Sequence, residues 1–207
     1  GRGEIFREKK PRPYMENIHL IPFFSLYAET GDPPLLAQMA SDYSNPQHFF
    51  TEKLMRPFIE TWCFFARERG ILLESHGQNT LLEVDGSLTP RRIVHRDFQS
   101  IYVDIDLRRS KGLPLDFNKH LAGEECPAEQ TYSLVYDHYV GDYLLKNMVA
   151  VMERHFGSRG LEQEIRELFR YFYGPDTGKF PSVSYGHGKM LEGNVCKLEP
   201  IGDPVFR

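Results

Sequence analysis

The spacing of apolar residues changes once in the first half of the chain, and this change constrains the fold more than any other feature. Between positions 45 and 69 the apolar residues recur every four positions, as on one face of an α-helix: Phe50, Leu54, Phe58, Trp62 and Ala66. Asn45 suits the N-cap of this helix, and Pro46 suits its first position. Pro57 predicts a kink or a detached first turn. Gly70 ends the helical pattern.

After Gly70 the sequence takes the alternating pattern of β-strands. Four segments fit this pattern, at 71–75, 80–84, 91–95 and 100–107. The Asp-Gly pair at 85 and 86 is a hairpin signal between the second and third segments. We therefore expect an antiparallel meander that follows the helix.

The helical spacing returns after Glu129 and continues to His155. One face of this predicted helix carries a tyrosine stripe that we interpret as packing: Tyr132, Tyr136, Tyr139 and Tyr143. Asp137 and His138 are interpreted as exposed polar neighbours, with a role in facing a ligand as the alternative. A second helix is predicted after Ser158, with its inward positions at Leu161, Ile165, Leu168 and Phe172.

The order of these patterns predicts an α+β protein, in which an antiparallel sheet with packed helices precedes a helical lobe. We expect a polar lead-in over 1–17, a sheet-containing part over 18–125, and a helical part with a loop-rich tail over 126–207. The sequence does not begin with Met, as expected of a piece of a longer chain or of an expression remnant.

The composition excludes several classes of partner. The 207 residues are 41% hydrophobic, which is enough to bury a core. The net charge of -4 and the pI near 6.1 leave no basic surplus, so we expect neither a nucleic acid nor an acidic membrane surface as a partner. The sequence contains no apolar run long enough to span a membrane and no recognisable secretion signal.

The three cysteines, Cys63, Cys126 and Cys196, are far apart and lie outside any CxxC pattern. This spacing indicates neither a disulfide framework nor a zinc site. A reducing cytosol is the compartment that fits such cysteine usage best.

Two polar clusters interrupt the predicted strands, "ESHGQN" at 74–79 and "VHRDFQS" at 94–100. Antiparallel pairing of one hairpin would bring these clusters side by side. Glu74, Asn79 and Asp97 would then offer two carboxylates and an amide oxygen, a typical ligand set for Mg²⁺. These three residues follow one another along the chain in the same relative order as the Asp, Asn and metal-binding Asp of protein-kinase-like enzymes.

Each motif also has a simpler interpretation when it is taken alone. An Arg-Asp pair such as Arg96–Asp97 is more often a surface ion pair than part of a metal site. His76 alone is more often a hydrogen-bonded loop histidine than a catalytic one. The two clusters together, at this spacing, favour a site.

The segments "GILLESHGQNTLLEV" and "RRIVHRDFQSIYV" resemble the C-terminal half of the siderophore synthetases that work independently of nonribosomal peptide synthetases, the aerobactin synthetase type. This region is also known by a ferric-reductase-like name. The family signature is a Glu-x-His-x-Gln-Asn turn followed by an Arg-Asp-Phe/Leu strand. The upstream stretch "IPFFSLYAETGDPPLLAQMA" is similar as well, so the likeness covers residues 18–120.

The resemblance implies an ATP-dependent ligase that adenylates a carboxylate, such as citrate or a citryl or dicarboxylate derivative, and passes it to an amine, hydroxylamine or alcohol. Its cofactors would be ATP and Mg²⁺. The implied catalytic residues are His76 and Arg96. The implied nucleotide-binding residues are His76, Gln78, Asn79 and Asp97. The implied Mg²⁺ ligands are Glu74, Asn79 and Asp97.

The resemblance also implies a palm-like, distantly kinase-like sheet region and a thumb-like helical lobe in a cytoplasmic bacterial enzyme. The His-Pro-rich loop of the family belongs to its N-terminal half and has no counterpart in residues 1–45. That half is therefore an expected partner, and a second copy of the chain is another candidate.

Three alternatives belong to other functional classes. A free-standing kinase-like nucleotide binder would need a phosphate-clamping Lys and a Gly-rich loop. An iron-sulfur ferric reductase would need a cluster held by cysteine thiolates. A noncatalytic interaction domain is the third alternative.

Overall fold

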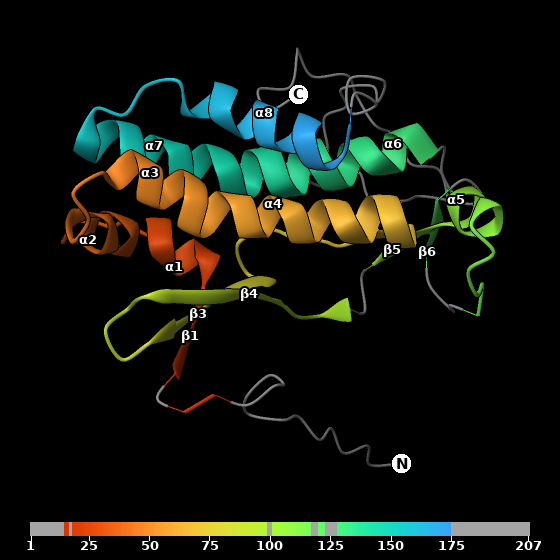
Figure 1. Cartoon of the computed structure of the whole chain (residues 1–207), viewed down its shortest axis with the longest axis horizontal. Coiled ribbons are helices and arrows are strands. Elements are labelled where there is room, and N and C mark those ends of the chain that lie inside the picture. Colours follow the sequence, from red (N-terminus) through yellow and green to blue (C-terminus); the bar gives the residue numbers. More distant parts are fainter. Residues whose placement is uncertain (1–14, 17, 99–100, 117–119, 123–127, 175–207) are drawn as a thin grey trace.

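The computed structural model describes residues 15–16, 18–98, 101–116, 120–122 and 128–174 (Figure 1). The first half contains β1 (Ile18–Pro22), α1 (Phe23–Tyr27), α2 (Leu35–Ser41), α3 (Pro46–Phe49), η1 (Phe50–Met55), α4 (Arg56–Cys63), η2 (Phe64–Glu68), β2 (Ile71–Leu72), β3 (Thr80–Asp85) and β4 (Pro90–His95). The second half contains β5 (Tyr102–Asp104), α5 (Ile105–Ser110), β6 (His120–Ala122), α6 (Ala128–Ser133), η4 (Leu134–Leu145), α7 (Lys146–Phe156) and α8 (Leu161–Phe172). The elements labelled η are π-helical. The predicted α+β class is confirmed.

The first predicted helix runs without a break from α3 through η2 (Figure 1). The Asn45 side chain accepts a hydrogen bond from the His48 amide at 3.0 Å, and Pro46 occupies the first helical position. Pro57 does not detach the first turn. Instead, the π-helical bonding of η1 changes to α-helical bonding at Arg56, just before Pro57. The wider turns of η1 accommodate the proline that lacks an amide donor.

The predicted four-stranded meander is wrong, because the strands form two separate sheets. β3 and β4 pair as the expected hairpin, but the other neighbour of β3 is β1, giving the antiparallel order β1-β3-β4. β2 pairs antiparallel with β5, and β6 pairs parallel with β5. β1 pairs with the edge of β3 at which the predicted meander places the segment 71–75.

The predicted strand over 100–107 is shorter than expected. It ends at Asp104, whose carboxylate accepts a hydrogen bond from the Leu107 amide at 2.9 Å and so caps α5. The Asp104 carboxylate also accepts a hydrogen bond from the buried Tyr132 hydroxyl at 2.8 Å. One side chain thus starts a helix and ties β5 to α6.

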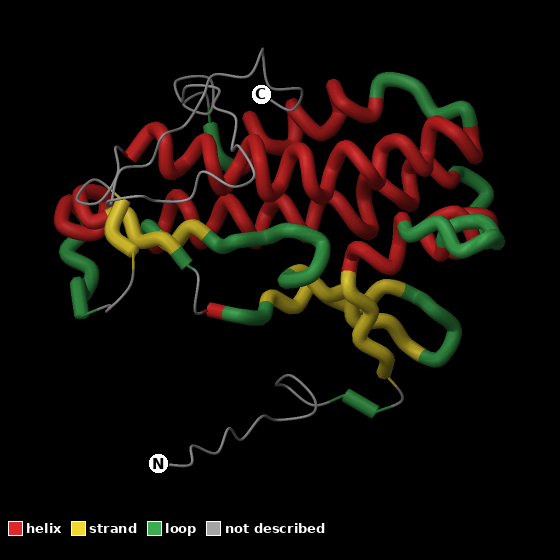
Figure 2. Tube along the Cα trace, turned by 180° about the vertical axis from the view of Figure 1, so that it is seen from behind, coloured by secondary structure: helices red, strands yellow, loops and turns green. Residues whose placement is uncertain are grey.

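The helices form a layer that covers one side of the β1-β3-β4 sheet (Figures 1 and 2). The predicted helix after Glu129 is confirmed as the continuous run α6, η4 and α7, which ends where Gly157 takes a φ of 61°. α8 is also confirmed. Its Glu164 accepts a hydrogen bond from Thr51 at 2.7 Å, which ties α8 to η1.

The hydrophobic core lies among the helices and extends to the strands that they cover. Trp62 of α4 packs against Tyr136 and Phe169, with ring centroids 5.5 and 6.0 Å apart. The core contains buried residues from before and after residue 125, and the predicted boundary at 125 stays a prediction. None of the helices in the described ranges is long and apolar enough to cross a membrane. The predicted tail, from 175 onward, lies outside the described residues.

Candidate functional site

A cavity of about 850 Å³ lies between the polar turn, α1 and the η4–α7 helix. One wall is polar and is formed by Glu74, His76, Gln78 and Arg96. A second wall is mainly aromatic and is formed by Phe24, Tyr27, His138, Tyr139 and Tyr143, together with Asn147. The cavity therefore brings together residues from three distant parts of the chain.

The polar turn is held by its own backbone and by α1. The amides of Asn79 and Thr80 donate to the His76 carbonyl at 3.0 and 3.1 Å. The Phe24 amide of α1 donates to the Gly77 carbonyl at 3.0 Å. A Cβ at Gly77 would lie 2.9 Å from the Phe24 nitrogen and would collide with the Tyr27 hydroxyl. Glycine is therefore required at 77 for this close approach.

The hairpin brings the two predicted polar clusters together. Thr80 and His95 are partners in the β3–β4 ladder. Beyond the ladder, the Arg96 amide donates to the Asn79 carbonyl at 3.0 Å, and Arg96 Nε donates to the Gln78 carbonyl at 2.9 Å. The guanidinium of Arg96 is thereby fixed beside the polar turn.

His76 is a hydrogen-bond donor that faces the cavity. Burial lowers the pKa of its imidazole, while Asp97 raises this pKa and Arg96 lowers it further by smaller amounts. Its Nδ1 accepts a hydrogen bond from the Gln78 amide at 3.2 Å, so the proton of the neutral ring lies on Nε2. Nε2 lies 3.9 Å from a Glu74 oxygen. The ring also meets the ring of Tyr139, with centroids 5.9 Å apart.

The three predicted metal ligands do not all line the cavity. Glu74 does, whereas Asn79 is buried, Asp97 is exposed, and neither of these two lines the cavity. Asp97 has a φ of 60°, a left-handed conformation that Asp tolerates better than most residues and that occurs often at functional sites. Within the described ranges, no group of three or more His, Cys, Asp or Glu side chains is placed to hold a metal ion. The predicted set has two carboxylates and one amide, so the assignment stays a prediction.

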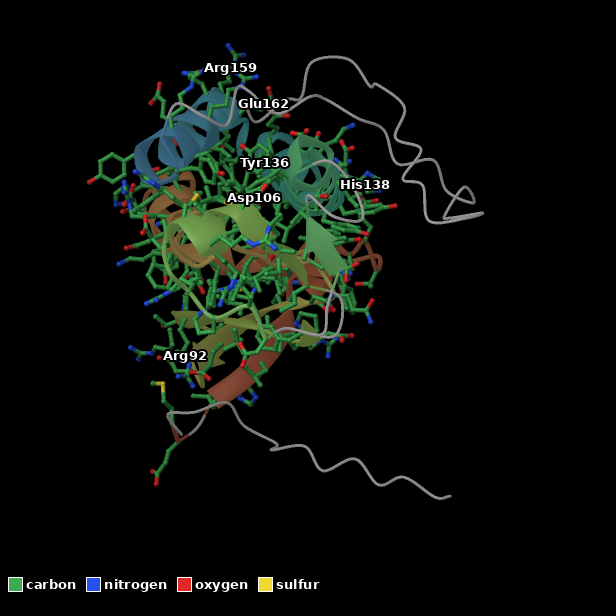
Figure 3. All side chains as sticks on the ribbon, turned by 90° about the vertical axis from the view of Figure 1, so that its right-hand side faces the viewer. Arg92, Asp106, Tyr136, His138, Arg159 and Glu162 are labelled. Carbon is green, nitrogen blue, oxygen red and sulfur yellow. The ribbon has the colours of Figure 1, made fainter. Side chains whose placement is uncertain are left out.

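The aromatic wall corrects the interpretation of the second helix. Asp137 and His138 were expected to be exposed, but only 5% and 8% of their surfaces are accessible. His138 lines the cavity, as its alternative interpretation required, and its Nδ1 lies 3.6 Å from an Asp142 carboxylate oxygen. Figure 3 shows Tyr136 among the helices and His138 at the edge of the helical layer.

The four tyrosines of the stripe lie in two different environments. Tyr132 and Tyr136 are buried and pack, as predicted, whereas Tyr139 and Tyr143 face the cavity. The Tyr27 hydroxyl donates to the Tyr143 carbonyl at 2.9 Å. Because η4 is closed by i→i+5 bonds, side chains three and four residues apart no longer share one face as they do in an α-helix.

Comparison with known proteins gives matches among solved structures. No protein-family profile matches the sequence, and no curated protein sequence matches it. Aerobactin synthetase IucC from Klebsiella pneumoniae matches 78% of this chain with a TM-score of 0.63 and 19% identity. The petrobactin biosynthesis protein AsbB from Bacillus anthracis matches 80% of it with a TM-score of 0.59 and 20% identity. ATP-bound aerobactin synthetase IucA from Klebsiella pneumoniae matches 73% of it with a TM-score of 0.58 and 16% identity.

The chain has the fold of these siderophore-synthesis proteins over the matched region. It spans 28% to 30% of the length of the three structures. The resemblance that the two motifs indicated therefore extends to the three-dimensional fold. Sequence reasoning brought together the residues of the polar wall of this cavity, because both clusters belong to one hairpin.

A second cavity of about 410 Å³ lies between the α4–η2 helix and α8. Its lining includes Cys63, Arg67 and Phe172 but none of the residues of the two polar motifs. Burial raises the pKa of the Cys63 thiol, which disfavours the reactive thiolate. The larger cavity is therefore the candidate site.

Proposed function

We propose that this chain is the C-terminal part of an ATP-dependent siderophore synthetase. The enzyme adenylates a carboxylate, such as citrate or a citryl or dicarboxylate derivative, and condenses it with an amine, hydroxylamine or alcohol. The observation that carries this proposal is the meeting of the two signature motifs on one wall of a large cavity. The synthetase fold supports it.

The polar wall suits the binding of nucleotide phosphates. His76 offers a neutral Nε2–H donor, and Arg96 offers a fixed positive charge a short distance away. Adenylation concentrates negative charge at the α-phosphate, and donors that are already in place stabilise this charge as it develops. Gln78 is exposed at the same wall and would add an amide donor. No covalent bond to the protein is needed.

Oxygen ligands that suit Mg²⁺ lie on or near the same wall. The carboxylates of Glu74 and Asp97 both lie near the His76 ring, the first at 3.9 Å and the second close enough to affect its pKa. Hard oxygen ligands of this kind suit Mg²⁺, which keeps several waters and binds phosphates. Glu74, Asn79 and Asp97 would hold the ion, which supplies charge neutralisation for the triphosphate when it is bound.

The aromatic wall would receive the organic parts of the substrates. Four aromatic rings line the same cavity as the phosphate-binding wall, so a nucleotide and an acyl group or acceptor would fit in contact with one another. In this proposal, residues 18–125 form the palm-like region and the helices after 126 form the thumb-like lobe of a cytoplasmic bacterial enzyme. A preceding half of the same enzyme would supply the remaining triphosphate contacts, and a second copy remains a candidate partner.

An exchange assay on the full-length protein tests the proposal. It measures the incorporation of pyrophosphate into ATP, which should depend on the added carboxylate. Asp97→Asn should abolish exchange with the fold intact, because it removes a negative charge from the metal site with little change in volume. His76→Ala should weaken the use of ATP through a lost phosphate donor. Asp106→Asn is the matched control, since Asp106 lies on the exposed face of α5 away from the cavity, and it should exchange at the unsubstituted rate.

Three results would contradict parts of this proposal. Exchange by the Asp97→Asn protein at the unsubstituted rate would rule out the metal assignment. Exchange by the 207-residue chain alone would show that the triphosphate contacts lie within it, contrary to the expected dependence on a preceding half. Nucleotide binding without exchange in the full-length protein would favour the noncatalytic alternative.

A further inference from the structure

A serine and a histidine meet behind the polar wall of the cavity. Ser75 has no accessible surface, and its hydroxyl lies 3.4 Å from Nδ1 of His95 at the end of β4. Neither residue lines the cavity. The His95 ring also lies near the ring of Phe58 of α4, with ring centroids 6.2 Å apart. The pair therefore lies between the core helix and the polar wall.

The two residues occupy matching places in the two motifs. Ser75 stands between Glu74 and His76, which both face the cavity. His95 stands directly before Arg96, which faces the cavity as well. On the cavity side, the bond from Arg96 Nε to the Gln78 carbonyl links the motifs. The Ser75–His95 contact links the same two segments from behind.

Packing alone does not account for a histidine at this position. The Nε2 atom of His95 is buried and has no hydrogen-bond partner among the described residues, which costs free energy. A phenylalanine would fill this space beside Phe58 without such a cost. The contact that an imidazole makes and a hydrocarbon ring cannot make is the one with Ser75.

We propose that Ser75 and His95 are positioning residues that fix the polar turn against the end of β4. Their contact sets Glu74 and His76 relative to Arg96. Neither residue touches the ligand. The placement itself is a property of the free chain, and only its effect on nucleotide use rests on the proposed function.

NMR of the ¹⁵N-labelled 207-residue chain tests the placement directly. We expect Ser75→Ala and His95→Phe to keep the dispersed amide spectrum of the folded chain. Both should shift the Arg96 Nε–H signal and the ring-nitrogen signals of His76, because the turn is released on its buried side. The double variant should shift them no further than the larger single change, since both substitutions remove one contact. Ser41→Ala, which removes a serine hydrogen bond on α2, should leave both sets of signals unchanged.

Kinetics of the full-length protein separate this inference from the proposed function. If both hold, Ser75→Ala and His95→Phe should each lower kcat/KM for ATP by about tenfold or more, as is typical when the support of a ligand-binding residue is lost. The double variant should lose no more than the worse single variant. Shifted signals without any exchange in the unsubstituted protein would support the positioning and contradict the proposed function. Unchanged His76 and Arg96 signals in the two variants would overturn the positioning, whatever the exchange assay gives.

Discussion

Mild acid should destabilise this fold through one histidine. Burial lowers the pKa of His95 from 6.5 to about 4. At a pH between about 4 and 6.5, His95 binds a proton in the unfolded chain but not in the folded chain. The free energy of unfolding therefore falls as the pH drops below 6.5, and the contribution of His95 is fully lost below about 4.

The size of this effect follows from the shift. The difference between 6.5 and about 4 corresponds to about 3 kcal/mol at 1.36 kcal/mol per pKa unit. Most of this loss in the free energy of unfolding develops before the pH reaches about 4, so about 2 kcal/mol should be lost between pH 7 and pH 5. This loss is a large fraction of the stability of a typical domain.

Urea unfolding at pH 7 and pH 5 measures the effect in the unsubstituted chain and in His95→Phe. The loss of stability between the two pH values should be smaller by about 2 kcal/mol in His95→Phe, whatever the substitution costs at pH 7. His155→Gln is the control, because His155 is exposed in the last turn of α7, and it should lose as much stability as the unsubstituted chain. An equal loss in His95→Phe and in the unsubstituted chain would refute the reasoning.

Two further predictions concern stability at neutral pH. Gly77→Ala would place a Cβ 2.9 Å from a backbone nitrogen of α1 and should lower the free energy of unfolding by about 1–3 kcal/mol, whereas Gly86→Ala, with no atom within 4 Å, should have little effect in the same thermal scan. Tyr132→Phe removes a buried donor to Asp104 and should cost about 1–3 kcal/mol in urea unfolding. The control Tyr171→Phe should cost much less, since Tyr171 is 76% exposed, and equal losses would contradict the role of the buried bond.

Local signals in the sequence predicted the helices well. The first helix was readable because its cap, its first proline and its four-residue spacing all agree, and the structure follows each of them up to Gly70. The sheets were less readable, because the partner of β3 is decided by β1, which lies about sixty residues earlier in the chain. No local pattern reports such pairing. The early end of the last predicted strand has a visible cause in Asp104, which can also cap a helix.

The contrast between local signals and long-range packing also explains which parts of the site were predicted. The polar wall comes from two segments of one hairpin, so their meeting follows from a turn signal at 85 and 86. The aromatic wall comes from α1 and η4, whose contacting residues Tyr27 and Tyr143 are 116 positions apart. Only the packing of the folded chain brings them together. The buried state of His138 escaped prediction because the i→i+5 bonding of η4 rotates its side chains away from the α-helical pattern.

The short helix α1 forms part of the aromatic wall and also contacts the polar turn. Its Phe24 amide holds the turn at Gly77, and its Tyr27 hydroxyl holds the backbone of η4 at Tyr143. The spacing between the polar turn and η4 is therefore set by a helix of five residues. Under the proposed function, a substitution in α1 that keeps these two hydrogen bonds would alter the size of molecule that the cavity admits and leave His76 and Arg96 in place. The choice of substrate would then change separately from the groups proposed to bind phosphate.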